Sequence, residues 1–164
     1  MLLFLLHAAY AQEHTTDSAD SHKHEYHQNH GASFLGATTR LDAEDTGLTI
    51  GTEYTRRFGS WGVGFMVEMA SSRVERDIII GVPVSLYPWR ELVLFLAPAV
   101  EVASFEELHG SESKQVTELE PLFRFGMAYW FALNETIALA PTFQADVTKG
   151  HWSLVYGLSI GVGF

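Results

Sequence analysis

The sequence predicts an all-β fold, an eight-stranded antiparallel up-and-down β-barrel that crosses a membrane. Three observations predict it: segments in which large apolar side chains alternate with small or polar ones, a second face made mostly of Gly, Ala, Ser and Thr, and connections that alternate between short and long. Alternation with a period of two residues is the pattern of a β-strand whose two faces differ. The expected strands span residues 32–41, 48–58, 61–71, 77–87, 91–103, 116–131, 136–147 and 152–164.

The last segment shows the alternation most clearly. One face carries large apolar or aromatic side chains, namely Leu154, Tyr156, Leu158, Ile160, Val162 and Phe164. The other face carries Val155, Gly157, Ser159, Gly161 and Gly163. The third and sixth segments repeat this division, so the large apolar side chains point to one side of the sheet.

The alternation does not say which face lies inside, because a soluble lipocalin-like carrier is also an eight-stranded barrel and keeps its apolar side chains inward. A face exposed to water is rich in charged side chains, lysine among them. The chain has only three lysines, and none of them lies in an expected strand. Small side chains suit the narrow lumen of an eight-stranded barrel, and bulky apolar ones suit lipid. We therefore expect the apolar face to be outside.

The connections support the same orientation, because bacterial membrane barrels have short periplasmic turns and longer external loops. We expect external loops at residues 42–47, 72–76, 104–115 and 149–151, and periplasmic turns at residues 59–60, 88–90 and 132–135. Aromatic residues near these turns predict an interfacial girdle, formed by Phe58, Trp61, Tyr87, Trp89, Tyr129, Trp130, Phe131 and Phe164. Prolines lie near the middles of four strands, at Pro83, Pro98, Pro121 and Pro141. Each removes a ladder hydrogen bond, so they count against these strands unless bulges absorb them.

The N-terminal residues differ from the rest of the chain. Residues 1–11 form an apolar run that ends in Ala9-Tyr10-Ala11. The run is shorter than the roughly 20 residues that a membrane-spanning helix needs, and its small terminal side chains are typical of a signal-peptide cleavage site. We expect cleavage before Gln12. Residues 12–30 contain no aliphatic side chain larger than Ala and predict a disordered, His-rich periplasmic tail, followed by the barrel at residues 31–164.

In its architecture, the segment 31–164 resembles the small eight-stranded outer-membrane proteins, a group that includes the OmpX-like proteins and the OmpA transmembrane domain. The C-terminal strand, with Tyr156 and other apolar residues at alternate positions up to Phe164, resembles the signal read by the barrel-assembly machinery. The resemblance implies a monomer in the outer membrane of a Gram-negative bacterium, surrounded by lipid and lipopolysaccharide. It assigns Tyr156 and Phe164 to the assembly signal and implies nothing about activity.

Charged side chains on the small-residue face are expected to point into the lumen. They are Glu53, Arg57, Glu68, Glu101, Glu118, Glu120, Arg124 and Asp146. Burial forces such groups to pair with one another or to change their protonation. They form either a salt-bridge network that holds the narrow barrel closed, or, because acids outnumber arginines, a cation path or binding site in the lumen.

Histidines concentrate in the expected tail, at His14, His22, His24, His27 and His30. Imidazole is the commonest side-chain ligand of transition metals, and closely spaced histidines on a flexible chain can wrap one ion. The tail is therefore either a solvated polar linker or a binding segment for zinc, copper, nickel or cobalt. The absence of cysteine excludes Cys-based metal sites and thiol catalysis, and the net charge of −10 argues against nucleic acid.

One short motif bears on catalysis. His151-Trp152-Ser153 is similar to the His-x-Ser arrangement of the lipid A deacylase PagL. A nucleophilic serine needs a histidine that a third group orients, yet no Asp or Glu follows Ser153, and Asp146 lies one strand back. We expect a non-catalytic barrel with a structural or binding role in the envelope. The alternatives are a narrow ion or solute conduit, a soluble lipocalin-like carrier and a lipid A-modifying enzyme.

Overall fold

The computed structural model describes residues 28–43, 45–72, 75–109 and 112–163. The regular elements in these ranges are β-strands, and no helix there is long and apolar enough to cross a membrane. The strands are β1 (Asn29–Arg40), β2 (Asp45–Phe58), β3 (Trp61–Ser71), β4 (Glu75–Gly81), β5 (Val84–Leu86), β6 (Leu92–His109), β7 (Glu112–Tyr129), β8 (Phe131–Ala132), β9 (Ile137–Thr148) and β10 (His151–Gly163).

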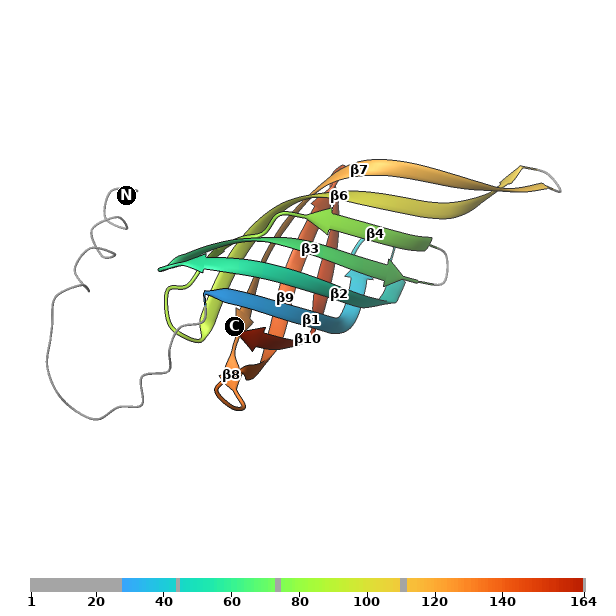
Figure 1. The fold of residues 1–164 in the computed structure, drawn as a ribbon. Coiled ribbons are helices and arrows are strands. Elements are labelled where there is room, and N and C mark those ends of the chain that lie inside the picture. The colour runs from blue at the N-terminus through green and yellow to red at the C-terminus, as the bar shows by residue number, and fades with distance from the viewer. Residues whose placement is uncertain (1–27, 44, 73–74, 110–111, 164) are drawn as a thin grey trace, which may run out of the picture.

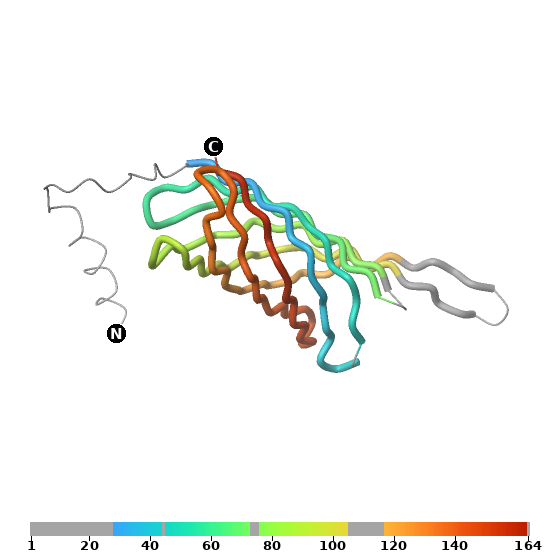
Figure 2. Tube along the Cα trace, turned by 90° about the horizontal axis from the view of Figure 1, so that it is seen from below, coloured from blue at the N-terminus to red at the C-terminus, as the bar shows by residue number. Residues whose placement is uncertain are grey.

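The strands form one closed antiparallel sheet (Figure 1, Figure 2). Neighbours in sequence pair with each other, and β10 pairs with both β9 and β1, which closes the barrel. β4 and β5 occupy the same place between β3 and β6, and β7 and β8 both pair with β9. Each of these two couples is one barrel strand with a short interruption. The predicted eight-stranded up-and-down barrel is therefore confirmed.

The strand registers run unbroken past the prolines, so the strands accommodate them without bulges. The segments on either side of Pro83 keep the same register with β3 and with β6, and the prolines of β6, β7 and β9 also lie inside single registers. The carbonyl oxygens of Pro83 and Pro98 still accept hydrogen bonds, from the backbone N–H groups of Gly64 at 2.9 Å and Val82 at 3.1 Å. Each proline thus removes one donor without adding a residue to its strand.

The barrel is apolar outside and more polar inside. Each barrel strand exposes large apolar side chains, such as Leu35, Ile50, Phe65, Ile78, Leu96, Phe123, Phe143 and Leu158. The buried side chains include many polar ones, such as Thr49, Thr55, Ser85, Arg124, Gln144 and Ser159. A soluble carrier has the opposite arrangement, because its apolar side chains line the cavity. The soluble alternative is therefore wrong, and the outer face is suited to lipid.

The pair that closes the barrel depends on two glycines. Gly36 of β1 lies opposite Gly157 of β10. A Cβ atom on Gly157 would collide with the backbone of Leu35 and Gly36, and the buried ring of Phe34 lies where a Cβ atom on Gly36 would stand. The two backbones come this close because neither residue has a side chain.

The connection at residues 104–115 is a continuation of two strands rather than the expected loop. β6 and β7 pair without interruption from Leu92 with Tyr129 to His109 with Glu112. In Figure 1 this hairpin reaches beyond the other strands, at the end of the barrel opposite the C-terminus. Outside the lipid band both faces of a ribbon meet water, so the apolar alternation that marks a strand in the sequence is lost while the backbone hydrogen bonds remain.

The start of the folded domain also differs from the expectation. β1 begins at Asn29, and His30 pairs with Thr55 on one side and Gly163 on the other. His30, which we grouped with the disordered tail, is therefore part of the barrel wall. The backbone hydrogen bonds on both sides stabilise an extended conformation that its polar side chain does not reveal.

Candidate functional site

A fully buried arginine bridges the lumen. Arg124 of β7 lies opposite its register partner Asp146 of β9, and donates from Nε to Oδ1 at 2.6 Å and from Nη2 to Oδ2 at 2.8 Å. This bidentate geometry is the strong and directional form of the pair. Arg124 Nη1 also lies 2.6 Å from Oε2 of Glu68 on β3. β3 and β9 are separated by three barrel strands in either direction, so the two carboxylates come from opposite walls.

Glu68, Arg124 and Asp146, which we call the central triad, are buried in the middle of the barrel. The exposed fraction of the side chain is 0% for Arg124, 7% for Glu68 and 5% for Asp146. Charges buried this deeply persist only when they are paired and hydrogen-bonded. A buried apolar cluster lies on the neighbouring positions of the same strands and of β4 and β6, and consists of Met66, Ile79, Ala97 and Leu122. The triad and this cluster together fill the centre of the lumen.

The central triad stands between two cavities. The cavity toward the short turns has a volume of about 520 Å³ and includes Glu68 in its wall, and we call it the turn-side cavity. The cavity toward the opposite end has a volume of about 230 Å³ and includes Asp146, and we call it the loop-side cavity. The remaining predicted lumen charges divide between them: Glu53 and Arg57 line the turn-side cavity, and Glu101, Glu118 and Glu120 line the loop-side cavity. The predicted charges therefore form separate groups, and the side chain of Glu118 in the loop-side group is 49% exposed.

The acids of the loop-side cavity have close polar partners. Lys149 Nζ lies 2.5 Å from Glu120 Oε1 and 3.9 Å from Glu118 Oε2, and the hydrogen bond to Glu120 raises the pKa of the lysine above its usual value. Thr148 donates from Oγ1 to Glu101 Oε2 at 3.2 Å. Lys149 therefore offsets one negative charge of this group, and Thr148 satisfies part of the hydrogen-bonding capacity of Glu101.

A second ion pair in this cavity was missed at the sequence level. Arg40 Nη2 donates to Asp77 Oδ2 at 3.0 Å, and both residues line the loop-side cavity. The signal was present, because Arg40 and Asp77 have the same inward parity as Thr38 and Ile79 on their strands. Both residues stand near the ends of expected strands, and the predicted set of lumen charges did not include them.

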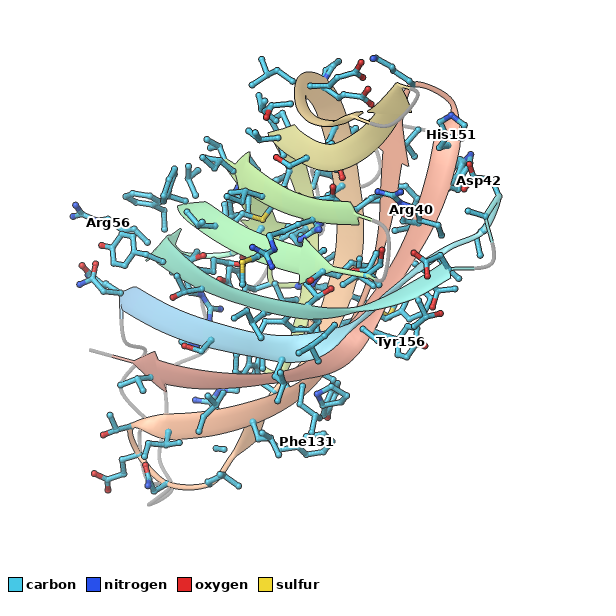
Figure 3. The ribbon with its side chains drawn as sticks, turned by 90° about the vertical axis from the view of Figure 1, so that its right-hand side faces the viewer. Arg40, Asp42, Arg56, Phe131, His151 and Tyr156 are labelled. Atoms are coloured by element: carbon cyan, nitrogen blue, oxygen red, sulfur yellow. The ribbon has the colours of Figure 1, made fainter. Side chains whose placement is uncertain are left out.

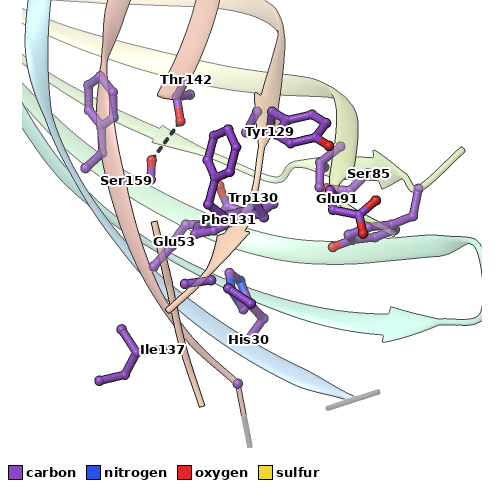
Figure 4. Close-up of a pocket in the computed structure, with 18 of the residues that line it drawn as sticks. His30, Glu53, Ser85, Glu91, Tyr129, Trp130, Phe131, Ile137, Thr142 and Ser159 are labelled. Atoms are coloured by element: carbon purple, nitrogen blue, oxygen red, sulfur yellow. Dashed lines mark hydrogen bonds between the residues drawn. The ribbon is translucent and has the colours of Figure 1, made fainter. Parts of the chain in front are cut away.

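Aromatic side chains line the turn-side cavity (Figure 4). Trp130 and Tyr87, which we expected in the outer girdle, line this cavity instead. The rings of His30 and Trp130 meet edge to face with their centroids 4.7 Å apart, and the Arg57 guanidinium lies 4.1 Å from the centroid of Tyr87. Both aromatic residues occupy inward-pointing positions in the alternation of their strands. This alternation sets the direction of their side chains, even though both residues lie close to a turn. The other described girdle residues are exposed, namely Phe58, Trp61, Trp89, Tyr129 and Phe131, and of these Tyr129 and Phe131 also border the turn-side cavity.

Comparison with known proteins defines the fold. No family model matches the sequence, and no curated protein matches it either. Among solved structures, Ail of Yersinia pestis matches with a TM-score of 0.62, at 8% identity, over 85% of this chain and 100% of that chain. The N-terminal β-barrel domain of Pseudomonas aeruginosa OprF matches with a TM-score of 0.56, at 9% identity, over 84% and 99% of the two chains. This chain has the fold of the small eight-stranded outer-membrane β-barrels. The neisserial surface protein NspA shares that fold, with a TM-score of 0.55, 10% identity, and coverage of 83% of this chain and 96% of that chain.

Of the two residues assigned to the assembly signal of this outer-membrane barrel fold, the structure describes only one. Tyr156 lies on β10 with its side chain exposed, and its hydroxyl is 3.4 Å from Oγ1 of Thr39 (Figure 3). Phe164 lies outside the described residues. The role of both residues in assembly stays a prediction.

Most of the predicted metal-binding segment lies outside the described residues. This applies to His14, His22, His24 and His27, and also to the expected signal peptide. Within the described ranges, no group of three or more His, Cys, Asp or Glu side chains is arranged to hold a metal ion. His30 packs against Trp130 inside the barrel, so it differs from the flexible ligand that the sequence suggested.

His151 has an acidic partner that the sequence did not reveal. Its Nδ1 lies 2.5 Å from Oδ2 of Asp42, in the connection between β1 and β2 (Figure 3). Ser153 lines the same loop-side cavity, but its hydroxyl makes no hydrogen bond within the described part of the chain. The acid that orients the histidine is therefore present, while the contact that would activate the serine is missing.

Proposed function

We propose that this protein is a non-catalytic barrel of the outer membrane, with a lumen closed to solutes and a structural or binding role in the envelope. The central triad carries the proposal. Its guanidinium has no exposed surface and joins carboxylates from opposite walls, while the lumen of an eight-stranded barrel is only wide enough for side chains to fill. A solute crossing the barrel would have to break these ion pairs.

The proposed location is supported by the apolar outer surface and by the fold shared with outer-membrane proteins. We propose lipid and lipopolysaccharide as the surroundings of the apolar band, and the barrel-assembly machinery as a transient partner. We also propose a monomer, because the sheet of the described strands is closed and offers no unpaired edge to a second copy.

Conductance of the refolded protein in planar bilayers tests the closed lumen. We expect no sustained channel activity from the native protein. We expect small, steady conductance from the triple variant Glu68→Ala/Arg124→Ala/Asp146→Ala, because it removes the central side chains. Glu118→Ala is the matched control, since Glu118 lies on the loop-side cavity away from the triad. Steady conductance of the native protein would refute the proposal.

A narrow ion or solute conduit is the second candidate, and one observation favours it. Cavities lie on both sides of the central triad, so rearrangement of a few side chains would connect them. In the bilayer experiment a conduit would show brief openings of the native protein. A variant whose central triad is held more rigidly would lose these openings.

An enzymatic role is the candidate with the weakest support. Asp42 orients His151, but the Ser153 hydroxyl is not engaged by the histidine. We expect the refolded protein to release no fatty acid from lipid A. Release that is abolished in Ser153→Ala and reduced in Asp42→Asn would establish the enzyme instead.

We also propose that the segment before β1 binds a divalent transition metal through His14, His22, His24 and His27. The support is the spacing of the histidines in the sequence. Calorimetry with zinc or copper on the whole protein should show binding that is lost when these four residues are replaced together by Gln. Binding that survives the replacement would contradict the assignment.

A further inference from the structure

The turn-side cavity has the size of a small-molecule site. Its volume of about 520 Å³ lies within the range of about 300 to 1,000 Å³ that is usual for ligand pockets. The lining combines apolar and aromatic side chains with many polar and charged ones, in roughly equal numbers. Figure 4 shows several of these side chains converging from different strands.

One deep side chain of this cavity lacks a hydrogen-bond partner. Gln144 of β9 is only 4% exposed, and its Oε1 atom accepts no hydrogen bond within the described part of the chain. A buried acceptor without a donor costs about 1 to 3 kcal/mol. The neighbouring hydroxyls do not relieve it, because Thr142 and Ser159 are hydrogen-bonded to each other at 2.9 Å. A ligand that donates a hydrogen bond to Oε1 of Gln144 would therefore be stabilised in this cavity.

The cavity is lined by four glutamates, Glu53, Glu68, Glu91 and Glu135, and by two arginines, Arg57 and Arg90, so its acid excess favours a positively charged donor. Glu53 of β2 lines the same cavity, and its carboxylate accepts a hydrogen bond from Thr55. A carboxylate has acceptor sites for several donors, so one hydroxyl leaves capacity for another. An ammonium group offers three donors and a charge that suits both Glu53 and Gln144.

The walls of the cavity favour an apolar or aromatic body on that ligand. Phe34 and Phe95 are buried side chains that line it, and Trp130 lines it as well. The Arg57 guanidinium already lies over the face of Tyr87 at 4.1 Å, so an aromatic face of this cavity holds a cation.

We infer that the turn-side cavity binds a small organic ammonium ion with an apolar body, whose ammonium group donates to Gln144 and Glu53. This inference deepens the binding role proposed above. It is measured by ligand binding and the closed lumen by conductance, so the two can fail separately.

The test uses the whole chain, refolded in a nonionic detergent and titrated with 2-phenylethylamine and with tryptamine while backbone amide NMR spectra are recorded. We expect saturable shifts around the turn-side cavity. The neutral isostere 2-phenylethanol should bind at least about 10-fold more weakly, because it cannot make the charge-assisted hydrogen bonds. The anion 3-phenylpropionate, of similar size, should show no saturable shift.

Variants identify the groups that recognise the ammonium ion. Glu53→Gln and Gln144→Leu should each weaken 2-phenylethylamine binding by at least about 10-fold. Glu120→Gln in the loop-side cavity is the matched control and should leave binding unchanged. A shift in gel migration on boiling verifies folding, and Gln144→Met replaces Gln144→Leu if that variant does not fold. Equal affinity for the amine and the alcohol, no saturable binding of either amine, or equal losses in Glu53→Gln and Glu120→Gln would each overturn the inference.

Discussion

Glu68 and Asp146 come from opposite walls of the barrel and share the guanidinium of one arginine. Arg124 lies 2.6 Å from an oxygen of each carboxylate, and the three side chains have almost no exposed surface. The stability of the barrel is therefore tied to this arginine, because without it two carboxylates would be buried together.

Replacement of the arginine alone should be strongly destabilising. We expect Arg124→Met to lower the free energy of unfolding by about 3 to 5 kcal/mol, because it leaves two buried carboxylates without a counter-ion. Urea unfolding of the protein in detergent measures the loss. The triple variant Glu68→Leu/Arg124→Met/Asp146→Leu contains no unpaired charge and should recover most of it. An Arg124→Met protein as stable as the native one would show that the triad does not hold the barrel together.

The glycine pair at the closing strands should not tolerate a side chain. We expect Gly157→Val to lower the free energy of unfolding by about 1 to 3 kcal/mol, because its side chain would meet the backbone of Leu35 and Gly36. Leu158→Val, at the next residue on the lipid-facing side, is the control and should unfold like the native protein. The measurement is the temperature at which the compact gel band disappears. Equal temperatures for the two variants would argue against a steric role for the glycines.

The turn between β9 and β10 requires positive φ angles. Lys149 has a φ of 42° and Gly150 a φ of 88°, as in the two-residue turns that match the twist of a hairpin. We expect Gly150→Ala to cost about 1 to 2 kcal/mol in unfolding experiments, because the left-handed conformation is unfavourable for a residue with a Cβ atom. Lys149→Asn should be neutral or stabilising, since asparagine tolerates this conformation and the exposed ion pair with Glu120 contributes little. A Gly150→Ala protein that unfolds like the native one would contradict this explanation.

The contact between Asp42 and His151 should depend on pH. The backbone N–H of Asp42 itself is the main cause that lowers the pKa of its carboxyl, and His151 lowers it further. A carboxyl whose pKa is lower in the folded chain stabilises the fold above its unfolded pKa, about 3.9 for Asp, and this contribution is lost as the pH falls through the folded pKa. NMR titration of the carboxyl should give a midpoint below that value. His151→Gln should move the midpoint upward, but not fully, because the backbone hydrogen bond remains. A titration midpoint for Asp42 in the native protein at or above the usual pKa of an aspartate would contradict this prediction.

Much of the barrel could be predicted because side-chain parity is a local property of a strand. The inward direction of Arg124 and Asp146, and the outward direction of Leu158, follow from alternation with a period of two, whatever the strands pair with. The direction of Trp130 was predicted wrongly because its nearness to a turn was preferred over the alternation of its strand. The part of β6 and β7 that extends beyond the barrel wall was not predicted as strand because its sequence has no apolar alternation.

The sequence by itself therefore determined the fold class and which side chains face the lumen, because lipid outside and a narrow lumen inside impose opposite demands on alternate residues. Only the tertiary structure decided which lumen residues meet. Glu68 reaches Arg124, and Asp42 reaches His151, because closure of β1 onto β10 and the stagger of the strands bring distant segments to the same height in the barrel. That stagger is a collective property of the closed sheet, and no single strand encodes it.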